Sequence, residues 1–597
     1  MQYNISKISE YYRKHPWQVW HRCSTFAIKL MTFVLMLGWD WLTGSIRKNQ
    51  GKRAIHLRET ITKLGSTSIK LGQILSCRPD IIPPIYLNAI TDLQDQIPTF
   101  PDRIAYQLIE EELGSDYSEI YAELSPSPVA AASLGQVYQG RLKTGEVVAV
   151  KVQRPGLLES ISLDIYILRQ LAGLIQNNVS FVHSDLLAIV DELGTRLFEE
   201  ADYLHEAENA EKFAHLYGNI HNIKVPRIYR KYTSRQVLTM EWIFGIKLTE
   251  VETLKSLGLD PDYFINLGFE CALQQLLGEG FFHADPHPGN LLATAEGELA
   301  FIDFGMMSSL EVSYRYRFIE SMIHILMSDF EGLAEDYIKM GFLPPETNLK
   351  PLIPDLEEIF ASALGASVTE LGFNQIINKL SPLLYKYPFR LPTYYLLIFR
   401  SGASLEGIAL KVKPDLQVFA QAYPYVASRL LTATVPELKT CLQDILIKDN
   451  RINWQRLEQL IQYASKNKNS QLKTLINPLL NFIESESGSV FRQLLIRDIL
   501  ADLDALPSQL LTKIIQGIAG NAGIYISAQP PRTPTLDFIQ RVGKLLVANS
   551  VNPLEFVPDI VHLLLKPEAQ RLGQKVIEEW GWKMLKGFSL ELFVKNY

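Results

Sequence analysis

The sequence predicts an α+β fold in which a small β-sheet region precedes a mostly helical region. Strand-like runs at residues 136–139 and 147–152, joined by a Lys-Thr-Gly turn, predict a β-hairpin. Helical spacing of apolar residues dominates from residue 262 to 371, and the polar, proline-rich segment 283–290 interrupts it. Because loops within helical regions often carry chemistry, we expect a functional site at this segment.

The chain is long, mildly acidic and poor in cysteine. Its 597 residues exceed the ~250–300 at which single hydrophobic cores stop growing, so more than one structural unit is expected. The net charge of −7, without a basic block interleaved with aromatic residues, argues against nucleic acid as a partner. Four widely spaced cysteines without a C-x-x-C pair argue against a disulfide framework and favour an intracellular, reducing compartment.

The N-terminal segment combines an apolar run with tryptophans. Residues 26–42 are apolar and aromatic, but the uninterrupted part, 30–39, is shorter than the ~20 residues that a spanning helix needs. Basic residues precede the run and no A-x-A-like cleavage site follows, unlike a secretory signal. A peripheral helix on a membrane surface is therefore expected, and the alternative is a helix docked on the protein itself. The aromatic residues typical of such a membrane rim are Trp17, Trp20, Trp39 and Trp41.

Short helices, strands and longer helices are expected along the rest of the chain. Prolines punctuate a compact helical region at residues 52–113, and composition changes at 125–128. A mixed sheet with packed helices should follow, from helical patterns at 161–177 and 184–213 and strand-like runs at 223–229, 236–240 and 299–302. Beyond residue 414, further helices are predicted at 454–464, 491–503 and 508–518.

An alanine-rich segment has the spacing of a kinase phosphate-binding loop. The pattern G-x-G-x-x-G-x-V is matched with alanine at the first two glycine positions, and V-A-V-K follows, ending at Lys151. A lysine there neutralises the α and β phosphates of a nucleotide, whereas the alternative is an edge lysine with its head in water. The loop residues expected to contact the nucleotide are Ala130, Ala131, Ala132, Ser133, Gly135 and Val137.

The segment 283–290 preserves the H-x-D-x-x-x-x-N spacing of a kinase catalytic loop, and D-F-G follows eighteen residues after its aspartate. We expect Asp285 to accept or orient the proton of the attacking group. Asn290 and Asp303 are expected to hold Mg²⁺ on the phosphates. Each residue alone could be a turn or cap residue, but the motifs occur in the order of a kinase.

A segment after an apolar strand resembles the connection between kinase lobes, where backbone groups bind the adenine edge. It contains Met240, Glu241 and Ile243. For Met240, packing in the core is an equal alternative, because methionine readily fills gaps.

Two further motifs resemble the UbiB family of atypical kinase-like proteins. Lys70 and Gln73 match its K-x-G-Q signature, which ordinary protein kinases lack, and Glu200 and Asp202 match its E-x-D segment. The resemblance covers residues 52–410. It implies that Glu206 pairs with Lys151, with Glu200 as the second candidate. It also implies that Glu200 and Asp202 contact the K-x-G-Q helix, which places Lys70 and Gln73 over the pocket where a kinase accepts a peptide.

The resemblance also implies the domain organisation, namely an atypical protein-kinase-like, two-lobed fold with helical extensions at both ends. We expect an amphipathic segment at 1–46, a helical K-x-G-Q extension at 47–122, an N-lobe with a helical insert at 123–244, a C-lobe at 245–412 and a helical C-terminal extension at 413–597.

The function implied by the resemblance is that of an atypical kinase or ATPase using ATP (or ADP) and Mg²⁺ in prenylquinone metabolism, of the plastoquinone, ubiquinone or tocopherol type. A membrane lipid or prenylquinone precursor and quinone-biosynthesis enzymes are the implied partners, on a cytoplasmic or thylakoid-type membrane. The apolar tail segment 556–565 is consistent with such a surface. Two alanine methyl groups in the phosphate loop should alter nucleotide preference or turnover, because they restrict the backbone that glycine leaves free.

Two other functions remain as alternatives. The alternating residues His283, Asp285 and His287 could bind a transition metal in a metallohydrolase, although the D-F-G motif and Lys151 would then have no role. A non-catalytic scaffold that uses ATP to change shape and recruit biosynthetic enzymes is the second alternative.

Overall fold

The computed structural model describes residues 3–75, 78, 82–91, 99–131, 133–178, 185–364, 373–413, 418–432, 435–448, 450–465, 472–505, 534–549 and 551. They form two compact units, Met1–Arg315 with Tyr337–Val418, and Tyr316–Asp336 with Phe419–Tyr597. The predicted α+β class is confirmed, because the first unit contains sheets flanked by helices. The patterns at 508–518 and 556–565 lie outside the described residues.

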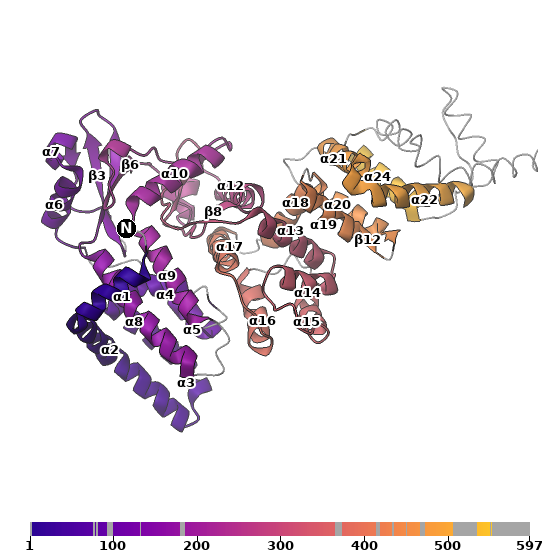
Figure 1. The fold of residues 1–597 in the computed structure, drawn as a ribbon. Helices are drawn as coiled ribbons and strands as arrows, with labels where there is room; N and C mark the ends of the chain where they lie inside the picture. Colours follow the sequence, from indigo (N-terminus) through magenta and orange to yellow (C-terminus); the bar gives the residue numbers. More distant parts are fainter. Residues whose placement is uncertain are drawn as a thin grey trace, which may run out of the picture. The chain divides into compact units, whose positions relative to one another are not determined.

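A five-stranded sheet forms the N-lobe of the first unit (Figure 1). Its strands run in the order β1-β3-β4-β6, and β2 pairs with the start of β3. The β3–β4 hairpin is the one predicted, and its turn uses Gly145 at φ 105°, a backbone conformation that glycine adopts without strain. Alternating burial on β3 and an almost fully buried β4 put apolar side chains on both faces of the hairpin. The strands are β1 (Tyr121–Leu124), β2 (Ala130–Ala131), β3 (Gly135–Leu142), β4 (Val147–Gln153) and β6 (Val237–Glu241).

Three helices lie between β4 and β6, and the last two supply acidic partners of the site. They are α8 (Leu157–Asn178), α9 (Leu186–Glu200) and α10 (Tyr203–Tyr217). The single helix predicted over residues 184–213 is therefore wrong, because the chain breaks at Ala201 and Asp202. Asp202 has an extended backbone (φ −111°, ψ 101°), and its carboxylate accepts the Leu204 N–H, so it caps a new helix instead of continuing α9.

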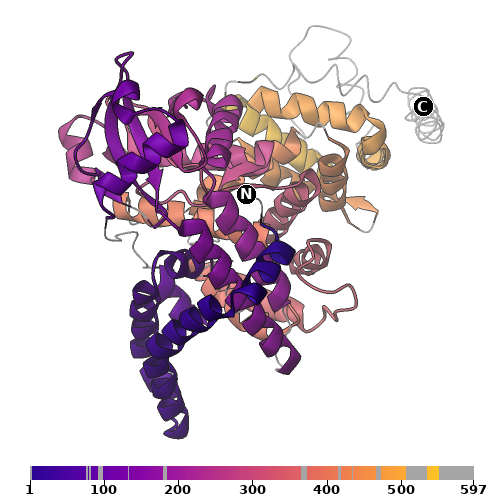
Figure 2. The same cartoon turned by 60° about the vertical axis from the view of Figure 1, so that its left-hand side comes forward.

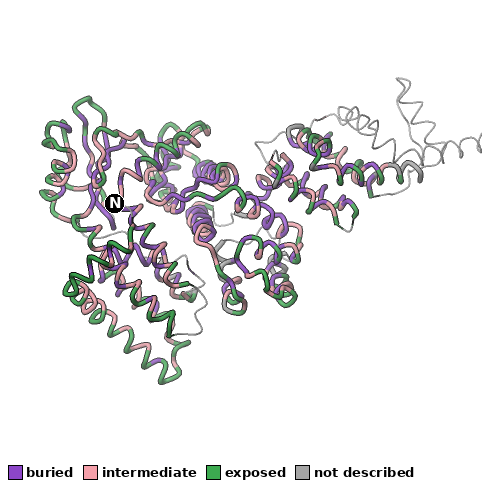
Figure 3. Tube along the Cα trace, viewed as in Figure 1, coloured by how far each residue is buried: buried purple, intermediate pink, exposed green. Residues whose placement is uncertain are grey.

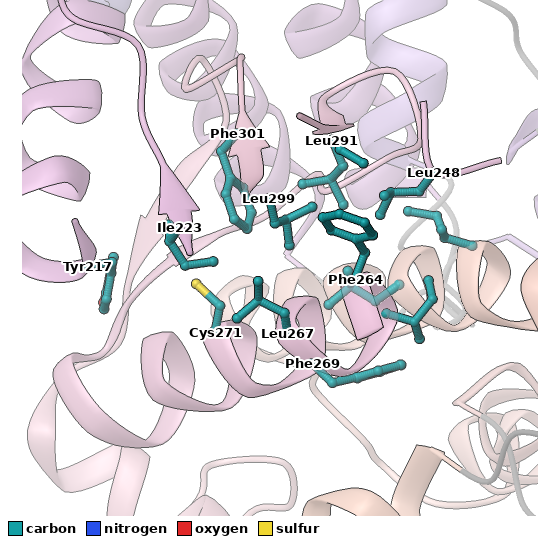
Figure 4. Close-up of a cluster of buried hydrophobic side chains, with 14 of the residues drawn as sticks. Tyr217, Ile223, Leu248, Phe264, Leu267, Phe269, Cys271, Leu291, Leu299 and Phe301 are labelled. Carbon is teal, nitrogen blue, oxygen red and sulfur yellow. The ribbon is translucent and has the colours of Figure 1, made fainter. Parts of the chain in front are cut away.

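The C-lobe surrounds the segment 283–290 with short strands and buried aromatic residues. One sheet has the order β5-β10-β9-β7, and β8 pairs with β11. Their core includes Phe264, Leu299 and Phe301 (Figure 4). The strands are β5 (Ile223–Lys224), β7 (Ile246–Lys247), β8 (Phe281–His283), β9 (Leu291–Ala293), β10 (Leu299–Phe301) and β11 (Met307–Ser309). The helical segments are η1 (Arg230–Tyr232), α11 (Val251–Ser256), α12 (Pro261–Leu273), the π-helical η2 (Gln274–Glu279), α15 (Leu352–Leu364), α16 (Phe373–Lys386) and α17 (Thr393–Val412).

The N-terminal helices include a long hairpin of α2 and α3, which run side by side in Figure 2. Helix α2 has 27 residues and is long and apolar enough to cross a membrane. From the sequence, the apolar segment was predicted to be too short to span a membrane. That prediction counted only the uninterrupted run 30–39, whereas the helix continues through Lys29 and Asp40. Much of α2 is exposed (Figure 3). The helices are α1 (Ile5–Lys14), α2 (Pro16–Leu42), α3 (Ile46–Leu64), α4 (Ser66–Leu75), α5 (Pro84–Thr91), α6 (Asp102–Leu113) and α7 (Tyr117–Ile120).

The second unit is almost entirely helical. Trp454 opens α20, and its ring lies 4.9 Å from that of Phe538 on α24. The amphipathic patterns predicted at 454–464 and 491–503 correspond to α20 and α22. Its elements are α13 (Val312–Leu326) and α14 (Phe330–Lys339), both shared with the first unit, α18 (Val418–Leu431), α19 (Pro436–Leu446), β12 (Ile447–Lys448), β13 (Arg451–Ile452), α20 (Trp454–Ala464), α21 (Leu472–Glu484), η4 (Glu486–Gly488), α22 (Ser489–Ala505) and α24 (Pro534–Ala548).

Candidate nucleotide site

The alanine-rich loop lies at the edge of the N-lobe sheet. Ala130 and Ala131 form β2 and pair antiparallel with the start of β3. Ser133 is fully buried, and its Oγ has no hydrogen-bond partner among the described residues. Gly135 permits a close approach, because a Cβ there would lie 2.5 Å from the Val152 carbonyl oxygen and 2.6 Å from the Tyr203 hydroxyl. Ala132 lies outside the described residues.

Lys151 is the centre of a buried charge network. It lies on β4 opposite Val137, and its Nζ is 2.5 Å from Glu206 Oε1 and 3.3 Å from Asp303 Oδ2. Burial alone would lower the pKa of Lys151, but the charges of Asp303 and Glu206 outweigh burial and raise it. Lys151 is therefore a fixed cation. The expected Lys151–Glu206 pair is present, across strand β4 and helix α10.

Backbone groups of the D-F-G segment hold Asp303 and Glu206 in place. The Gly305 N–H donates to Asp303 Oδ1 at 3.0 Å, and the Phe304 N–H donates to Glu206 Oε1 at 3.4 Å. Although burial raises the pKa of the Asp303 carboxyl, the Lys151 charge and the Gly305 N–H hold it well below its usual range. Asp303 is thus ionised, and its side chain is 41% exposed, which leaves it accessible to a cation.

His283 links the segment 283–290 to the D-F-G segment through its ring. Its buried ring accepts the Asp285 N–H at Nδ1 (3.1 Å) and donates from Nε2 to the Asp303 carbonyl oxygen (2.8 Å). Because burial lowers the pKa of His283, the ring is neutral, as this donor and acceptor pattern requires. Both ring nitrogens are occupied. Among the described residues, His283, Asp285 and His287 do not form a convergent ligand group, so the metallohydrolase alternative has no geometric support.

Asp285 lies on the loop between β8 and β9 and is paired with Arg400 of α17. Arg400 Nη2 is 2.9 Å from Asp285 Oδ2, and its Nη1 donates to the Gln73 carbonyl oxygen at 3.2 Å. Burial raises the pKa of Asp285, but Arg400, His287 and Lys70 together lower it below its usual value. The amide of Asn290 donates to the Asp285 carbonyl oxygen at 3.2 Å, which keeps the two residues of this loop adjacent.

A second lysine–glutamate pair connects α4 to α9. Lys70 Nζ of α4 is 2.5 Å from Glu200 Oε1 of α9, and both side chains are about nine-tenths buried. The positive charge of Lys70 lowers the pKa of both the Asp303 and the Asp285 carboxyl. The K-x-G-Q helix is therefore close to Asp285 and Asp303. Asp202, the other acidic residue of the E-x-D segment, caps α10 and lies 3.8 Å from Arg235.

The connection after β6 is fixed by backbone and side-chain contacts. Met240 is buried opposite Ala149 of β4, in agreement with core packing. The Glu241 carboxylate pairs with Lys224 at 3.0 Å and accepts the Arg227 N–H, so its side chain is held by these groups. The Trp242 N–H donates to the Val147 carbonyl oxygen. Among the described residues, neither the Ile243 N–H nor the following Phe244 N–H donates to a backbone carbonyl, so the adenine contact expected at Ile243 stays a prediction.

Comparisons with known proteins identify the chain. A family profile described as "ABC1 atypical kinase-like domain" matches residues 92–337, and another described as "ABC1 kinase 3, C-terminal domain" matches 489–586. The Arabidopsis thaliana protein ACTIVITY OF BC1 COMPLEX KINASE 3, chloroplastic, is 42% identical over 97% of this chain and 84% of its own length. The chain belongs to the ABC1 (UbiB) family of atypical kinase-like proteins.

Other relatives and one solved structure extend the comparison. An uncharacterised Synechocystis protein, sll0005, is 45% identical over 97% of this chain and 88% of its own. The aarF domain-containing kinase At1g71810 of Arabidopsis thaliana, also chloroplastic, is 40% identical over 84% of this chain and 73% of its own. The Mycobacterium tuberculosis structure "The complex structure of Rv3197-erythromycin" has 23% identity, a TM-score of 0.44 and covers 64% of this chain and 97% of its own.

The site of this ABC1 protein fits a nucleotide with a divalent cation. Ser133 offers a buried hydroxyl without a partner among the described residues, beside the close-packed Gly135. Lys151 could supply a fixed positive charge for phosphate oxygens, and the ionised Asp303 and Asn290 could supply oxygen ligands of the kind that Mg²⁺ prefers.

Sequence reasoning missed two residues of the cleft, Arg400 and Tyr203. Arg400 is 115 residues beyond Asp285, and a lone arginine in a helix gives no sequence signal. Tyr203 is buried directly after the E-x-D segment, and burial raises the pKa of its hydroxyl, so it remains protonated as a donor beside Gly135. Its position next to the cap residue Asp202 was the one available signal.

Proposed function

We propose that this ABC1 protein binds Mg-ATP and acts as an atypical kinase or ATPase that supports prenylquinone metabolism at a membrane. The observation that carries the proposal is the convergence of Lys151, Glu206 and Asp303, with Nζ-to-oxygen distances of 2.5 and 3.3 Å. A preformed cation beside an ionised carboxylate is what phosphate and Mg²⁺ binding require, since the metal and lysine together neutralise the phosphate charge.

Each residue of the site has a separate role in this proposal. Lys151 would bind the α and β phosphates, with Glu206 fixing its direction. Asp303 and Asn290 would hold Mg²⁺, which supplies charge neutralisation on the phosphates when bound. Asp285 would orient the attacking hydroxyl or water, and His283 positions Asp285 through its backbone N–H. The loop residues Ala130, Ala131, Ala132, Ser133, Gly135 and Val137 would line the phosphates.

The acceptor side favours a small substrate. The Lys70–Glu200 pair and the Arg400 contacts with Asp285 and the Gln73 carbonyl oxygen tie the K-x-G-Q helix to the catalytic aspartate. This arrangement restricts the acceptor side of the cleft, so water or a small lipid-like molecule suits it better than a protein segment. Efficient phosphorylation of unrelated proteins by the unaltered enzyme would contradict this part of the proposal.

Helix α2 supports the membrane part of the proposal. Its tryptophans are between 61% and 71% exposed, and Ile28, Val34 and Leu35 are exposed as well. The helix is nevertheless anchored, because Arg22 binds both carboxylate oxygens of the buried Asp164 on α8 at 2.7 Å. Exposed apolar side chains on a rigidly held helix are typical of an interfacial element. The chloroplastic relatives support a thylakoid-type surface.

ATP turnover with and without vesicles tests this proposal. The full-length protein should hydrolyse ATP only with Mg²⁺, and vesicles containing a prenylquinone should raise the rate. Asp285→Asn should remove turnover in both conditions, whereas the exposed control Glu296→Gln should not. Trp39→Ser/Trp41→Ser should remove only the vesicle effect, while Leu257→Ser, which alters a similarly exposed apolar residue just after α11, should leave it. Equal turnover with Asp285→Asn would contradict the catalytic assignment.

A non-catalytic, nucleotide-dependent scaffold is the second candidate, and the Asp285–Arg400 pair favours it. An aspartate neutralised by arginine at 2.9 Å is a weak proton acceptor. Nucleotide binding without turnover in any condition, together with cellular function retained by Asp285→Asn, would support the scaffold over the enzyme.

A further inference from the structure

Two consecutive helices, α13 and α14, bring three potential metal ligands together in the second unit. A tight turn at residues 327–329 joins the helices, with Ser328 in the left-handed region at φ 56°. The turn is closed by hydrogen bonds from the Ser328 N–H to the Ile325 carbonyl and from the Asp329 N–H to the His324 carbonyl. It is held by Arg456, which lies 2.7 Å from Asp329. Helix α14 therefore starts in a fixed position relative to the end of α13.

Glu320 and His324 are four residues apart on α13, so they share one face of the helix. Asp336 of α14 faces them, and its Oδ2 is 2.7 Å from His324 Nδ1. One potential ligand atom from each of the three residues lies within 4.8 Å of the others. The residues are 9%, 7% and 0% exposed, respectively.

The packing around His324 fixes its ring. Gly332, in the first turn of α14, lies against the imidazole, and a Cβ at this position would be 2.9–3.0 Å from three ring atoms. Only glycine leaves the ring this space. The Gly332 N–H donates to Asp329 Oδ1, so the same turn that joins the helices also places the glycine. A ligand whose orientation is set by packing loses little conformational entropy on metal binding.

We propose that Glu320, His324 and Asp336 bind one divalent transition-metal ion, for which zinc is the best candidate. One imidazole and two carboxylates are a donor set that Zn²⁺ accepts, with bonds of about 2.0–2.2 Å. In tetrahedral coordination the ligand atoms are about 3.3–3.6 Å apart, so a spacing of up to 4.8 Å requires only small side-chain rotations. The hydrogen bond between His324 and Asp336 would open, and His324 would bind the metal through its unprotonated ring nitrogen, with the ring proton on the other nitrogen. The ion would hold α13 to α14, and the site uses none of the residues proposed to bind the nucleotide.

Metal content of the full-length protein tests this site. The variant Asp303→Asn serves as the background, because it removes the main carboxylate proposed for Mg²⁺. After chelation, incubation with zinc chloride without nucleotide, and gel filtration, mass spectrometry should find about one zinc per chain. Adding His324→Gln, Glu320→Gln or Asp336→Asn to this background should lower zinc retention at least about tenfold, since each removes one of three ligands. Glu335→Gln, an exposed neighbour of Asp336 on α14, should retain the ion.

Two further measurements on the Asp303→Asn protein test the site without relying on variants that could fail to fold. Co²⁺ bound to the chelated Asp303→Asn protein should give the intense visible absorption of a four- or five-coordinate site, and zinc should displace it. Zinc should also raise the melting temperature of this protein, as any ligand of the native state does. Lack of stoichiometric zinc in the Asp303→Asn protein would overturn the proposal. So would unchanged zinc retention in folded His324→Gln and Glu320→Gln proteins.

Discussion

Two buried lysine–glutamate pairs near Asp303 are alike in geometry and differ in location. Lys151–Glu206 and Lys70–Glu200 have the same 2.5 Å separation and similar burial. The first connects the β-sheet to α10 beside Asp303. The second connects α4 to α9 and acts electrostatically on both catalytic aspartates. In the proposed function, the first pair serves the phosphates, as the corresponding pair does in ordinary kinases, and the second pair restricts the acceptor side.

Breaking the first pair should have the largest effect. Lys151→Met removes the fixed cation that would bind the phosphates, so ATP turnover should fall by about 10²–10³-fold. Steady-state kinetics with Mg-ATP measures this. The matched control is Lys143→Met, an exposed lysine in the β3–β4 turn, which should behave as wild type. Turnover within threefold of wild type for Lys151→Met would remove the phosphate side from the mechanism.

Replacing the second pair should change which acceptors are used and leave ATP binding nearly unchanged. The double variant Lys70→Met/Glu200→Leu substitutes apolar side chains for both charges, because a single replacement would leave a buried charge unpaired at a cost of about 3–5 kcal/mol. We expect ATP affinity to change less than about threefold, while phosphate transfer to an unrelated protein such as casein rises about tenfold. A loss of ATP affinity as large as that of Lys151→Met would show that the two pairs have one role.

The contact that joins the second pair's helix to Asp285 should have a smaller effect. Arg400→Lys keeps the charge but cannot contact Asp285 and the Gln73 carbonyl oxygen together, so kcat should fall by about tenfold with little change in the KM for ATP. Lys411→Arg, at an exposed position of the same helix, is the control. Increased turnover of Arg400→Lys would instead assign Arg400 an inhibitory role.

The pH dependence of folding stability should depend on His283, whose ring binds backbone groups of Asp285 and Asp303. Burial lowers the pKa of its ring, so the unfolded state binds a proton below pH ~6.5 while the folded state does not. The free energy of unfolding should therefore fall as pH decreases below ~6.5, by up to about 1.4 kcal/mol per pH unit from this group. His283→Asn should lose less stability than wild type between pH 6.5 and 5.5 in urea titrations. The exposed control His221→Asn should lose as much stability as wild type over this range. Identical pH dependence would contradict a neutral His283.

Motifs with regular spacing were predictable from the sequence, and contacts between distant segments were not. The β3–β4 hairpin, the α+β class and the order of Lys151, Asp285 and Asp303 follow from local patterns of a few residues. Arg400, and the grouping of Glu320 and His324 with Asp336, depend on how helices pack, which sequence spacing does not determine. Strands β8, β9 and β11 are too short to show an alternating pattern, and the break after Glu200 was missed because Asp202 was considered only as a motif residue.

The most direct test of the central claim is calorimetric binding of ATP to the full-length protein with and without Mg²⁺. In the wild type, Mg²⁺ should increase the affinity for ATP by at least about tenfold, because Asp303 holds the cation on the phosphates beside Lys151. In Asp303→Asn this increase should be lost, while the variant remains folded by circular dichroism. An equal effect of Mg²⁺ in both proteins, or no ATP binding by the wild type, would contradict the assignment of this cleft as an Mg-ATP site.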